Sequence, residues 1–391
     1  MRKARTEAER YRESVPALLQ WYSYNARVLP WREEPTPYHV WISEIMLQQT
    51  RVEAVRAYYE RFLQLFPDVQ AVASASEDRL VKAWEGLGYY SRIRNIHAAA
   101  QVICEQYGGE LPADYELLRN LPGIGDYTAG AIASMAFGLS APAVDGNVLR
   151  VYARLTGYRE DIRSPKYKKQ VTEGIADALA AWEQSEAGRV NQAIMDIGAT
   201  VCIPNGKPHC DVCSLSHLCA AYAEDLTEEI PMKTAKKSRP VQKKTVLVIR
   251  CGNRYLLHRR PRKGLLAGMW EFPNEEGHLT ARGAKDAVVR LLSEMDGFCR
   301  EAAGAVRKQF GIESNEAAMR SHRLPDGRHV FSHIEWDMRG YRVELADPGQ
   351  ALTCGEVNPD NIASDYVWAT AAEITERFGL PQAFQTYKLQ L

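Results

Sequence analysis

The stretch "LLRNLPGIGDYTAGAIASMAFG", residues 117–138, predicts two helices joined by a short glycine turn. Gly123 and Gly125 can adopt backbone angles that other residues avoid, and they let the chain approach a ligand closely. The second helix points its unpaired N–H groups toward the turn, which suits a phosphate. We therefore predict a helix–hairpin–helix at about 115–140 that contacts a DNA backbone, with Leu121 beside the two glycines. The alternative is a structural corner that ends in a glycine cap.

The chain of 391 residues is long enough for two domains. Apolar residues recur every three or four positions through residues 1–228, which predicts a mainly α-helical domain. The basic, proline-containing stretch 229–244 predicts a linker, with a contact to the DNA backbone as the equal alternative. Strand-like patterns follow, so we expect an α+β domain over 245–380. Within it, "HVFSHIEWDMRGYRVEL", residues 329–345, predicts a strand pair with Gly340 near its turn.

The overall composition is that of an ordinary globular protein, with 46% hydrophobic and 25% charged residues. No apolar run approaches the roughly 20 residues that span a bilayer. The N-terminus is charged and lacks an apolar signal core, so we expect an intracellular protein that does not associate with a membrane. The formal net charge is zero, which removes the simplest electrostatic argument for nucleic acid. A neutral total can nevertheless contain a basic face.

Four of the eight cysteines occur close together, namely Cys202, Cys210, Cys213 and Cys219, with gaps of seven, two and five residues. A disulfide framework is not expected in an intracellular chain of this length. Structural zinc sites usually contain two short pairs of cysteines, whereas this loop has one pair flanked by two single cysteines. The pattern favours a [4Fe–4S] cluster with a structural role. Zinc and fortuitous clustering remain the alternatives.

A single carboxylate, Glu44, lies among bulky apolar residues in "WISEIMLQQT", residues 41–50. Burial in such surroundings raises the pKa of a carboxyl group and keeps a proton available near neutral pH. Glu44 is therefore a candidate general acid. The alternative is a glutamate that reaches solvent at the rim of a helix or caps a helix N-terminus.

A second candidate, Asp145, follows an apolar stretch in "APAVDGNVLRVYARLTG" and opens a predicted helix. An aspartate at this position caps the helix. We expect the helix N–H groups to lower the pKa of Asp145 and keep it ionised. One protonated and one charged carboxyl group is the arrangement that cleaves a glycosidic bond.

The fragments "WISEIMLQQTRVEAV", "GLGYYSR", "LPGIGDYTAGAI" and "VDGNVLRV", followed by the four cysteines, resemble the adenine DNA glycosylases (the MutY family). That family belongs to the helix–hairpin–helix glycosylase superfamily together with endonuclease III. The resemblance extends over nearly the whole chain. It departs from the family pattern in one place, because the first cysteine gap is seven residues and not six. One extra residue in the loop 202–219 affects the geometry of a cluster more than the identity of its ligands.

The resemblance implies a base-excision-repair hydrolase that removes adenine mispaired with 8-oxoguanine or G. Its partner is double-stranded DNA that contains A·8-oxoG or A·G mispairs, and its cofactor is a [4Fe–4S] cluster held by the four cysteines. We expect a monomer in the cytoplasm of a bacterium, associated with the nucleoid. Residues 245–380 are similar to the Nudix-like domain of the family, which recognises 8-oxoguanine.

The resemblance implies four residues at the catalytic site, three of them with a stated role. Glu44 is the acid, Asp145 stabilises the electron-poor sugar, and Asn147 orients the nucleophile or the sugar. Bifunctional relatives carry a lysine where this chain has Tyr127. Without an amine at this position no Schiff base forms there, so a monofunctional glycosylase is expected.

The resemblance also implies an adenine flipped out of the duplex. Residues that match contacts to the orphaned 8-oxoguanine or the gap beside it are Trp31, Arg32, Gln49, Thr50, Leu87, Gly88 and Tyr89. The motif Phe331, Ser332 and His333 matches the reader of the damaged base, with Ser332 as its hydrogen-bond partner. The alternative for the aromatic ring of Tyr89 is core packing.

The segment "KGLLAGMWEFP" resembles a Nudix-like domain, but the Glu-rich box that holds Mg²⁺ in a hydrolase does not follow it. We therefore expect this domain to bind without hydrolysing. Three other functions remain open at this point. They are a bifunctional glycosylase/AP lyase, a non-catalytic DNA-binding iron–sulfur protein, and a nucleotide pyrophosphatase that uses residues 240–380.

Overall fold

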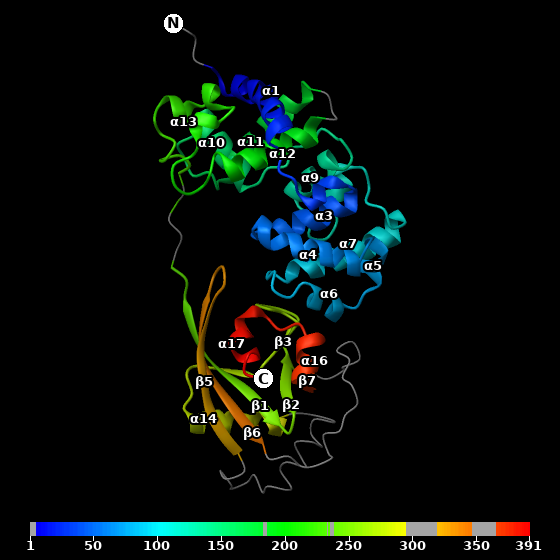
Figure 1. Cartoon of the computed structure of the whole chain (residues 1–391), viewed down its shortest axis with the longest axis vertical. Helices are drawn as coiled ribbons and strands as arrows, with labels where there is room; N and C mark the ends of the chain where they lie inside the picture. Colours follow the sequence, from blue (N-terminus) through cyan, green and yellow to red (C-terminus); the bar gives the residue numbers. More distant parts are fainter. Residues whose placement is uncertain (1–4, 183–185, 233, 235–237, 295–318, 346–364) are drawn as a thin grey trace. The chain divides into compact units, whose positions relative to one another are not determined.

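The computed structural model describes residues 5–182, 186–232, 234, 238–294, 319–345 and 365–391 (Figure 1). The chain divides into two compact units. The first unit combines residues 1–74 with 95–236, and the second combines residues 75–94 with 237–391.

The first unit is helical, which confirms the mainly α-helical prediction. Its helices are α1 (Glu7–Asn25), α2 (Pro30–Glu33), α3 (Pro37–Leu47), α4 (Val52–Leu65), α5 (Val69–Ser74), α7 (Ser91–Tyr107), α8 (Tyr115–Arg119), α9 (Asp126–Met135), α10 (Gly146–Thr156), α11 (Pro165–Ala180), α12 (Ala187–Thr200) and α13 (Ala220–Ala223). Two short 3-10 helices, Cys210–Val212 and Ser216–Leu218, lie in the cysteine loop.

Side-chain caps explain where several helices begin. The side chain of Thr6 and that of Glu9 form a capping box at the start of α1. The Thr36 side chain accepts the backbone N–H of His39 in α3, and the Asp145 side chain accepts those of Asn147 and Val148 in α10. Helix α10 ends at Gly157, which adopts the left-handed conformation with φ +77°. The helix starts predicted at these motifs therefore have a local chemical cause.

The predicted helix–hairpin–helix is formed by α8 and α9. Gly123 has φ +74°, and a Cβ atom there would lie 2.4 Å from the Cβ of Asn95. Gly125 has φ −95° and ψ −178°, an extended conformation open to any residue. The expectation of unusual backbone angles was therefore right for Gly123 and wrong for Gly125, which caps α9 with ordinary geometry.

Helix α9 approaches the segment before α10 very closely. A Cβ atom on Gly130 would lie 2.1 Å from the carbonyl oxygen of Pro142. Asn191 connects α12 to α9 in the same region, because its Nδ2 donates a hydrogen bond to Ser134 Oγ at 2.9 Å. A larger residue at position 130 would separate α9 from the start of α10, and these two segments carry Tyr127 and Asp145.

The second unit contains a seven-stranded sheet with the order β3-β2-β1-β6-β5, in which β4 pairs with β1 and β7 pairs with β2. The strands are β1 (Val241–Cys251), β2 (Arg254–Arg259), β3 (Trp270–Glu271), β4 (Asn274–Glu276), β5 (Met319–Val330), β6 (Glu335–Leu345) and β7 (Tyr366–Thr370). The helices are α6 (Glu77–Ala83), α14 (Ala281–Glu294), α16 (Ala371–Glu376) and α17 (Gln385–Lys388). This arrangement confirms the α+β prediction.

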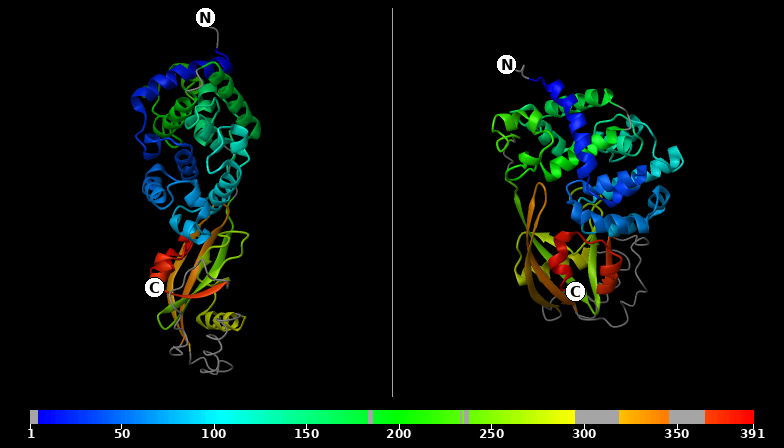
Figure 2. Two further views of the ribbon diagram at one scale, coloured as in Figure 1. Left: turned by 90° about the vertical axis from the view of Figure 1, so that its right-hand side faces the viewer. Right: turned by 45° about the horizontal axis from the view of Figure 1, so that its top comes forward.

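The sheet is covered on both faces, as Figure 2 shows. Leu247 and Ile249 of β1 pack in a cluster with Val288 of α14. The alternate residues Val246 and Val248 pack on the other face with Tyr387 of α17 and its neighbours. Successive side chains of a strand point to opposite faces of the sheet. Because both faces are covered, both sets of side chains are apolar.

The hairpin between β5 and β6 differs from its prediction. Its turn lies at residues 331–334, where the backbone N–H of Phe331 donates to the carbonyl of Ile334 at 2.8 Å. Gly340 lies inside β6 opposite Leu324, so the prediction of a turn near it was wrong. The glycine is needed for close approach, because a Cβ atom there would lie 2.3 Å from Cε1 of Tyr387.

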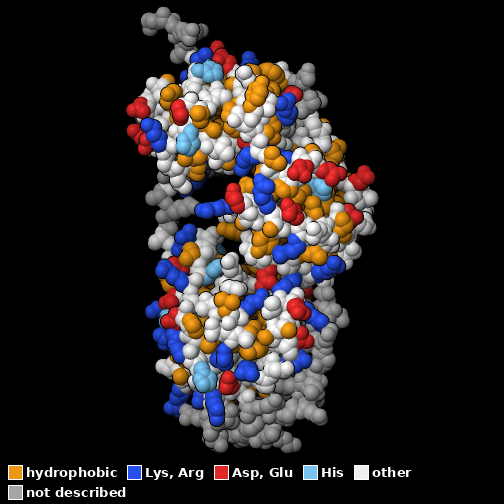
Figure 3. Space-filling model, viewed as in Figure 1, with side chains coloured by type: hydrophobic (Ala, Val, Ile, Leu, Met, Phe, Trp, Pro, Cys, Tyr) orange, Lys and Arg blue, Asp and Glu red, His pale blue; other side chains and the backbone are white. Residues whose placement is uncertain are grey.

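The stretch predicted as a linker, 229–244, overlaps β1, which begins at Val241. No helix in the described part of the chain is long and apolar enough to cross a membrane. On the face shown in Figure 3, Lys and Arg side chains are interspersed with Asp and Glu over the described surface.

We predict that Gly340→Val destabilises the protein by about 1–3 kcal/mol, because the new side chain overlaps Tyr387 in a packed core. Urea unfolding of the full chain measures the effect. The matched control is Gly283→Ala in α14, where the nearest atoms lie 3.5 Å from the new Cβ. This control should be neutral or stabilising. Equal stability of the Gly340→Val variant and the wild type would contradict the packing account.

Candidate active site

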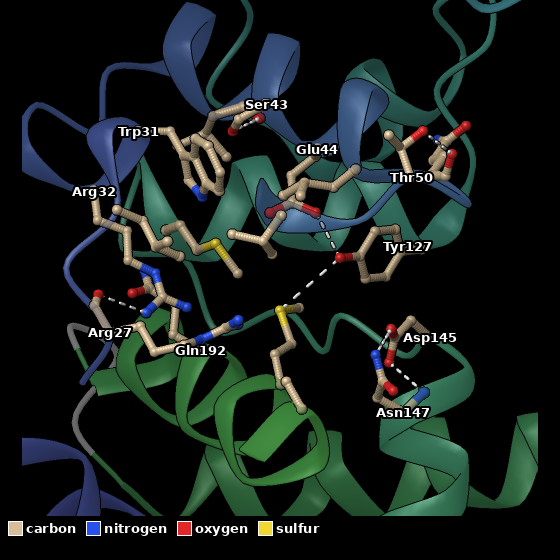
Figure 4. A pocket seen from close by; sticks show the side chains of 18 of the residues that line it. Arg27, Trp31, Arg32, Ser43, Glu44, Thr50, Tyr127, Asp145, Asn147 and Gln192 are labelled. Atoms are coloured by element: carbon tan, nitrogen blue, oxygen red, sulfur yellow. Dashed lines mark hydrogen bonds between the residues drawn. The ribbon is translucent and has the colours of Figure 1, made fainter. Parts of the chain in front are cut away.

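A pocket of about 480 Å³ opens in the first unit between α2, α3, α9, α12 and the start of α10. Figure 4 shows Arg27, Arg32 and Gln192 on one side, Asp145 and Asn147 on the other, and Glu44 with Tyr127 between them. The structure therefore brings both predicted carboxylates into one cavity, although they are 101 residues apart in the sequence.

Glu44 lies on α3 and its residue is only 5% exposed. The hydroxyl of Tyr127 donates a hydrogen bond to Glu44 Oε2 at 2.5 Å. Burial raises the pKa of Glu44 to about 7, and the charge of Asp145 adds to this effect, while the Tyr127 hydrogen bond and Arg32 oppose it. The predicted rise of this pKa is confirmed. About half of the Glu44 carboxyl groups are therefore protonated near neutral pH.

Asp145 caps α10 as predicted. Its Oδ1 accepts the backbone N–H groups of Asn147 at 2.9 Å and Val148 at 2.8 Å, and its Oδ2 accepts Asn147 Nδ2 at 2.9 Å. The predicted direction of its pKa was wrong. Burial raises the pKa of Asp145 above its ordinary value, although these hydrogen bonds and Arg150 oppose the rise. The helix N-terminus thus offsets part of the desolvation and does not dominate it.

Asn147 is held in place by Arg150, a residue that the sequence reasoning missed. Arg150 Nη2 donates to Asn147 Oδ1 at 3.0 Å and to the carbonyl of Gly198 at 2.7 Å. Its Nε donates to the carbonyl of Cys202 at 2.9 Å. The side chain therefore connects the residue beside Asp145 to the first cysteine of the loop. The spacing of three residues between Asn147 and Arg150 on one helix was the available signal.

Tyr127 lies at the position where bifunctional relatives carry lysine. Its hydroxyl also lies 3.9 Å from Sδ of Met195 on α12. Among the described residues that line the pocket, the cations are Arg27 and Arg32, and none is lysine. The described lining of the pocket therefore offers no side-chain amine to attack a sugar.

The residues matched to the orphaned base are found in two places. Trp31, Arg32, Gln49 and Thr50 line the same pocket as Glu44. Trp31 is buried, with its ring 5.5 Å from that of Tyr59 in a T-shaped arrangement. Because they line this pocket, Trp31 and Arg32 can contact a ligand that binds beside Glu44.

A second pocket, of about 540 Å³, lies in the second unit. Gly88, Tyr89, Phe331, Ser332 and His333 all line it. Tyr89 has φ +48° and is 45% exposed, so its ring does not belong to a packed core, whereas the neighbouring Leu87 is buried. The "FSH" motif and the "GLGYY" motif thus share one cavity.

The hairpin residues expected to contact a DNA backbone lie apart from both pockets. The side chain of Leu121 is buried, while Gly123 and Gly125 are exposed at the turn. The adjacent Asp126 is near Arg119 at 3.6 Å and Lys168 at 3.5 Å. Both ion pairs lie on the surface. The exposure of Gly123 and Gly125 leaves the backbone of the turn accessible to a ligand.

The four clustered cysteines are free thiols and are partly exposed. Burial raises the pKa of Cys213 to about 12, and the charges of the other three cysteines contribute to the rise. Arg154 Nη1 lies 3.2 Å from Cys202 Sγ. Within the described residues, no group of three or more His, Cys, Asp or Glu side chains converges closely enough to hold a metal ion. In donor type, four thiols in one loop, the cysteines nevertheless fit an iron–sulfur cluster.

Comparison with known proteins identifies both units. Residues 42–177 match the HhH-GPD superfamily base excision DNA repair proteins, and residues 245–390 match the NUDIX domain.

The chain is 33% identical over 380 residues to the adenine DNA glycosylase of Mus musculus, which covers 84% of this chain and 70% of that protein. It is 35% identical over 388 residues to the enzyme of the same name from Rattus norvegicus, with coverage of 86% and 71%. For the adenine DNA glycosylase of Buchnera aphidicola the identity is 36% over 257 residues, with coverage of 66% and 72%. With these identities along most of its length, the chain belongs to the adenine DNA glycosylase family.

Proposed function

We propose that this enzyme removes adenine opposite 8-oxoguanine or G in double-stranded DNA, by hydrolysing the N-glycosidic bond. The observation that carries the proposal is the buried Glu44 carboxyl group, which binds the Tyr127 hydroxyl in the same pocket as Asp145. Membership of the adenine DNA glycosylase family supports the choice of adenine.

In this mechanism Glu44 donates its proton to a ring nitrogen of the flipped adenine. The bond between the base and the sugar then breaks, and its electron pair leaves with the base. Asp145 stabilises the positive charge that develops on the sugar. Water adds to the anomeric carbon, and the Glu44 carboxylate takes the proton that this water releases. Trp31 and Arg32 line the pocket with Glu44, so we reassign them from the orphaned 8-oxoguanine to the flipped adenine.

We propose a monofunctional reaction because the pocket contains no lysine among its described residues. Gln49 and Thr50 line the same pocket, and we propose that they contact the orphaned 8-oxoguanine. Leu87, Gly88 and Tyr89 are proposed to fill the gap left by the flipped base. The exposed turn at Gly123 and Gly125, with Leu121, is proposed to hold a DNA phosphate.

The pocket of the second unit is proposed to bind 8-oxoguanine. The hydroxyl of Ser332 and the ring nitrogens of His333 supply polar groups there, and Phe331 supplies an aromatic surface. Phe331 is held by Trp336, whose ring lies 4.9 Å away in a T-shaped arrangement. A rigid aromatic surface beside a few polar groups is typical of a base-binding pocket.

We also propose that Cys202, Cys210, Cys213 and Cys219 hold a [4Fe–4S] cluster, which would supply structural support to the loop when bound. The four free thiols between residues 202 and 219 support this assignment by their donor type. We further propose that the protein acts as a monomer in the cytoplasm of a bacterial cell, at the nucleoid, where its DNA substrate lies.

The decisive assay uses a duplex with one A·8-oxoG pair. Wild-type enzyme should release adenine and leave the strand intact until alkali is added. Glu44→Gln should lower the single-turnover rate by about 10²–10⁴-fold, the usual contribution of a general acid, while binding to the duplex persists. Glu53→Gln, which removes an exposed carboxylate of α4, is the control. Full activity of the Glu44→Gln variant would refute the role of Glu44 as general acid. A borohydride-trapped adduct with the wild type would refute the monofunctional proposal.

The pH dependence should follow Glu44. The acid form is the active form, so the single-turnover rate should fall as the pH rises through about 7. Removing the hydroxyl in Tyr127→Phe deletes an interaction that lowers the pKa of Glu44. The part of the pH–rate profile in which the rate falls with rising pH (the falling limb) should therefore move to higher pH, even if the maximal rate is lower. A limb that stays in place would show that Tyr127 does not act on this carboxyl group.

Discrimination of 8-oxoguanine should depend on Ser332. Ser332→Ala should reduce the ratio of kcat/KM for A·8-oxoG to that for A·G by about 5–10-fold, the effect of one lost hydrogen bond. The single-turnover rate with A·G should be unchanged. Ser321→Ala in β5 is the control, because Ser321 does not line the pocket. An unchanged ratio would exclude Ser332 as the reader.

A further inference from the structure

A buried aspartate lies behind the wall of the Glu44 pocket. Asp196 of α12 is fully buried, and both of its oxygens are used. Arg32 binds it with two parallel bonds, Nη1 to Oδ2 at 2.8 Å and Nη2 to Oδ1 at 3.0 Å. Arg27 adds its Nε to Oδ1 at 2.7 Å and its backbone N–H to Oδ2 at 3.1 Å. One carboxylate therefore holds two guanidinium groups in place.

Both arginines line the pocket that contains Glu44 (Figure 4). Helix α12 explains the arrangement, since Gln192, Met195 and Ala199 lie on the same helix face as Asp196 and line the pocket. Asp196 itself is fully buried and is not among the residues that line the pocket. It touches the arginines and no reacting atom, so it is a positioning residue.

The charges of Asp196, Arg27 and Arg32 influence the protonation of the general acid, Glu44. Two guanidinium groups without a counterion, next to a carboxyl group, would favour the ionised form of that carboxyl group. The groups that face Glu44 are Tyr127 from α9, Asp145 from the start of α10 and Arg32 from α2. Those that face Asp196 are Arg27, Arg32 and the phenol of Tyr22 on α1.

Asp196 is itself ionised. Burial acts to raise its pKa, but the hydrogen bonds and charges of Arg32 and Arg27 outweigh burial, so its pKa lies below the ordinary value. The group of three side chains thus carries one net positive charge, where the two arginines alone would carry two.

We propose that Asp196 keeps Glu44 protonated near neutral pH by fixing Arg27 and Arg32 in the pocket wall and cancelling one of their charges. This inference rests on the proposed function, because it assigns Asp196 a part in supplying the proton that Glu44 donates to adenine.

The test is the pH dependence of adenine release from an A·8-oxoG duplex under single-turnover conditions. Asp196→Asn keeps the size of the side chain and removes its charge. The falling limb should then move to lower pH by about half a unit or more, a fraction of the shift that a directly adjacent charge produces. At a pH above the limb this shift is a loss of about threefold in rate. Asp196→Glu retains the charge and should restore the limb toward its wild-type position.

A second variant changes the same balance in the opposite direction. Arg27→Gln removes one cation, so the limb should move to higher pH. Combining it with Asp196→Asn should bring the limb back toward the wild-type value. If Asp196→Asn does not fold, the Arg27→Gln variant tests the inference by itself. A falling limb at higher pH than that of the wild type supports the inference, and an unmoved limb overturns it. A loss of rate in Asp196→Asn without movement of the limb shows a structural role only and overturns the inference.

The outcomes separate this inference from the proposed function. If the wild type releases no adenine, the proposed function fails. If the wild type shows a falling limb near pH 7 and the limbs of all three variants coincide with it, only the role of Asp196 fails.

Discussion

The burial of one carboxyl group against a tyrosine hydroxyl is the interaction on which the site depends. A solvated glutamate with an ordinary pKa of about 4.3 would be protonated in roughly 0.2% of molecules at pH 7. With a pKa of about 7, Glu44 is protonated in about half of them. Helix α3 supplies the apolar surroundings, and Tyr127 of α9 orients the group. Burying a carboxyl group costs free energy, and the surrounding helices must be stable enough to bear this cost.

The remainder of the pocket balances charge around this group. Asp145 and its three hydrogen bonds place an anion on one side. Arg32 and Arg27, tied to Asp196, place cations on the other. The close contact of Gly130 with Pro142 keeps α9 and the start of α10 near enough for these groups to share one cavity. The positions of the charged groups in the site therefore depend on the close packing that the small residue Gly130 allows.

Particular residues show which features of the structure the sequence patterns predict correctly and which they do not. The helices of the first unit, the cap at Asp145 and the α+β character of the second unit follow from periodicity and capping, and all three were predicted. Gly340 was assigned to a turn because glycine is frequent in turns, but the ring of Tyr387 requires it inside a strand. The pKa of Asp145 was predicted from the helix N-terminus alone, and burial by distant helices reversed its direction. Local rules failed where distant neighbours decided.

The amino-acid sequence by itself determined the types of element, the order of the motifs and the resemblance to a glycosylase family, because these depend on residues that are near one another along the chain. Only the tertiary structure decided which side chains meet. The bond between Tyr127 and Glu44 joins positions 83 residues apart, and that between Arg32 and Asp196 joins positions 164 apart. Such contacts leave no periodic signal in the sequence, since they arise from the packing of whole helices. The protonation of Glu44 is a product of that packing.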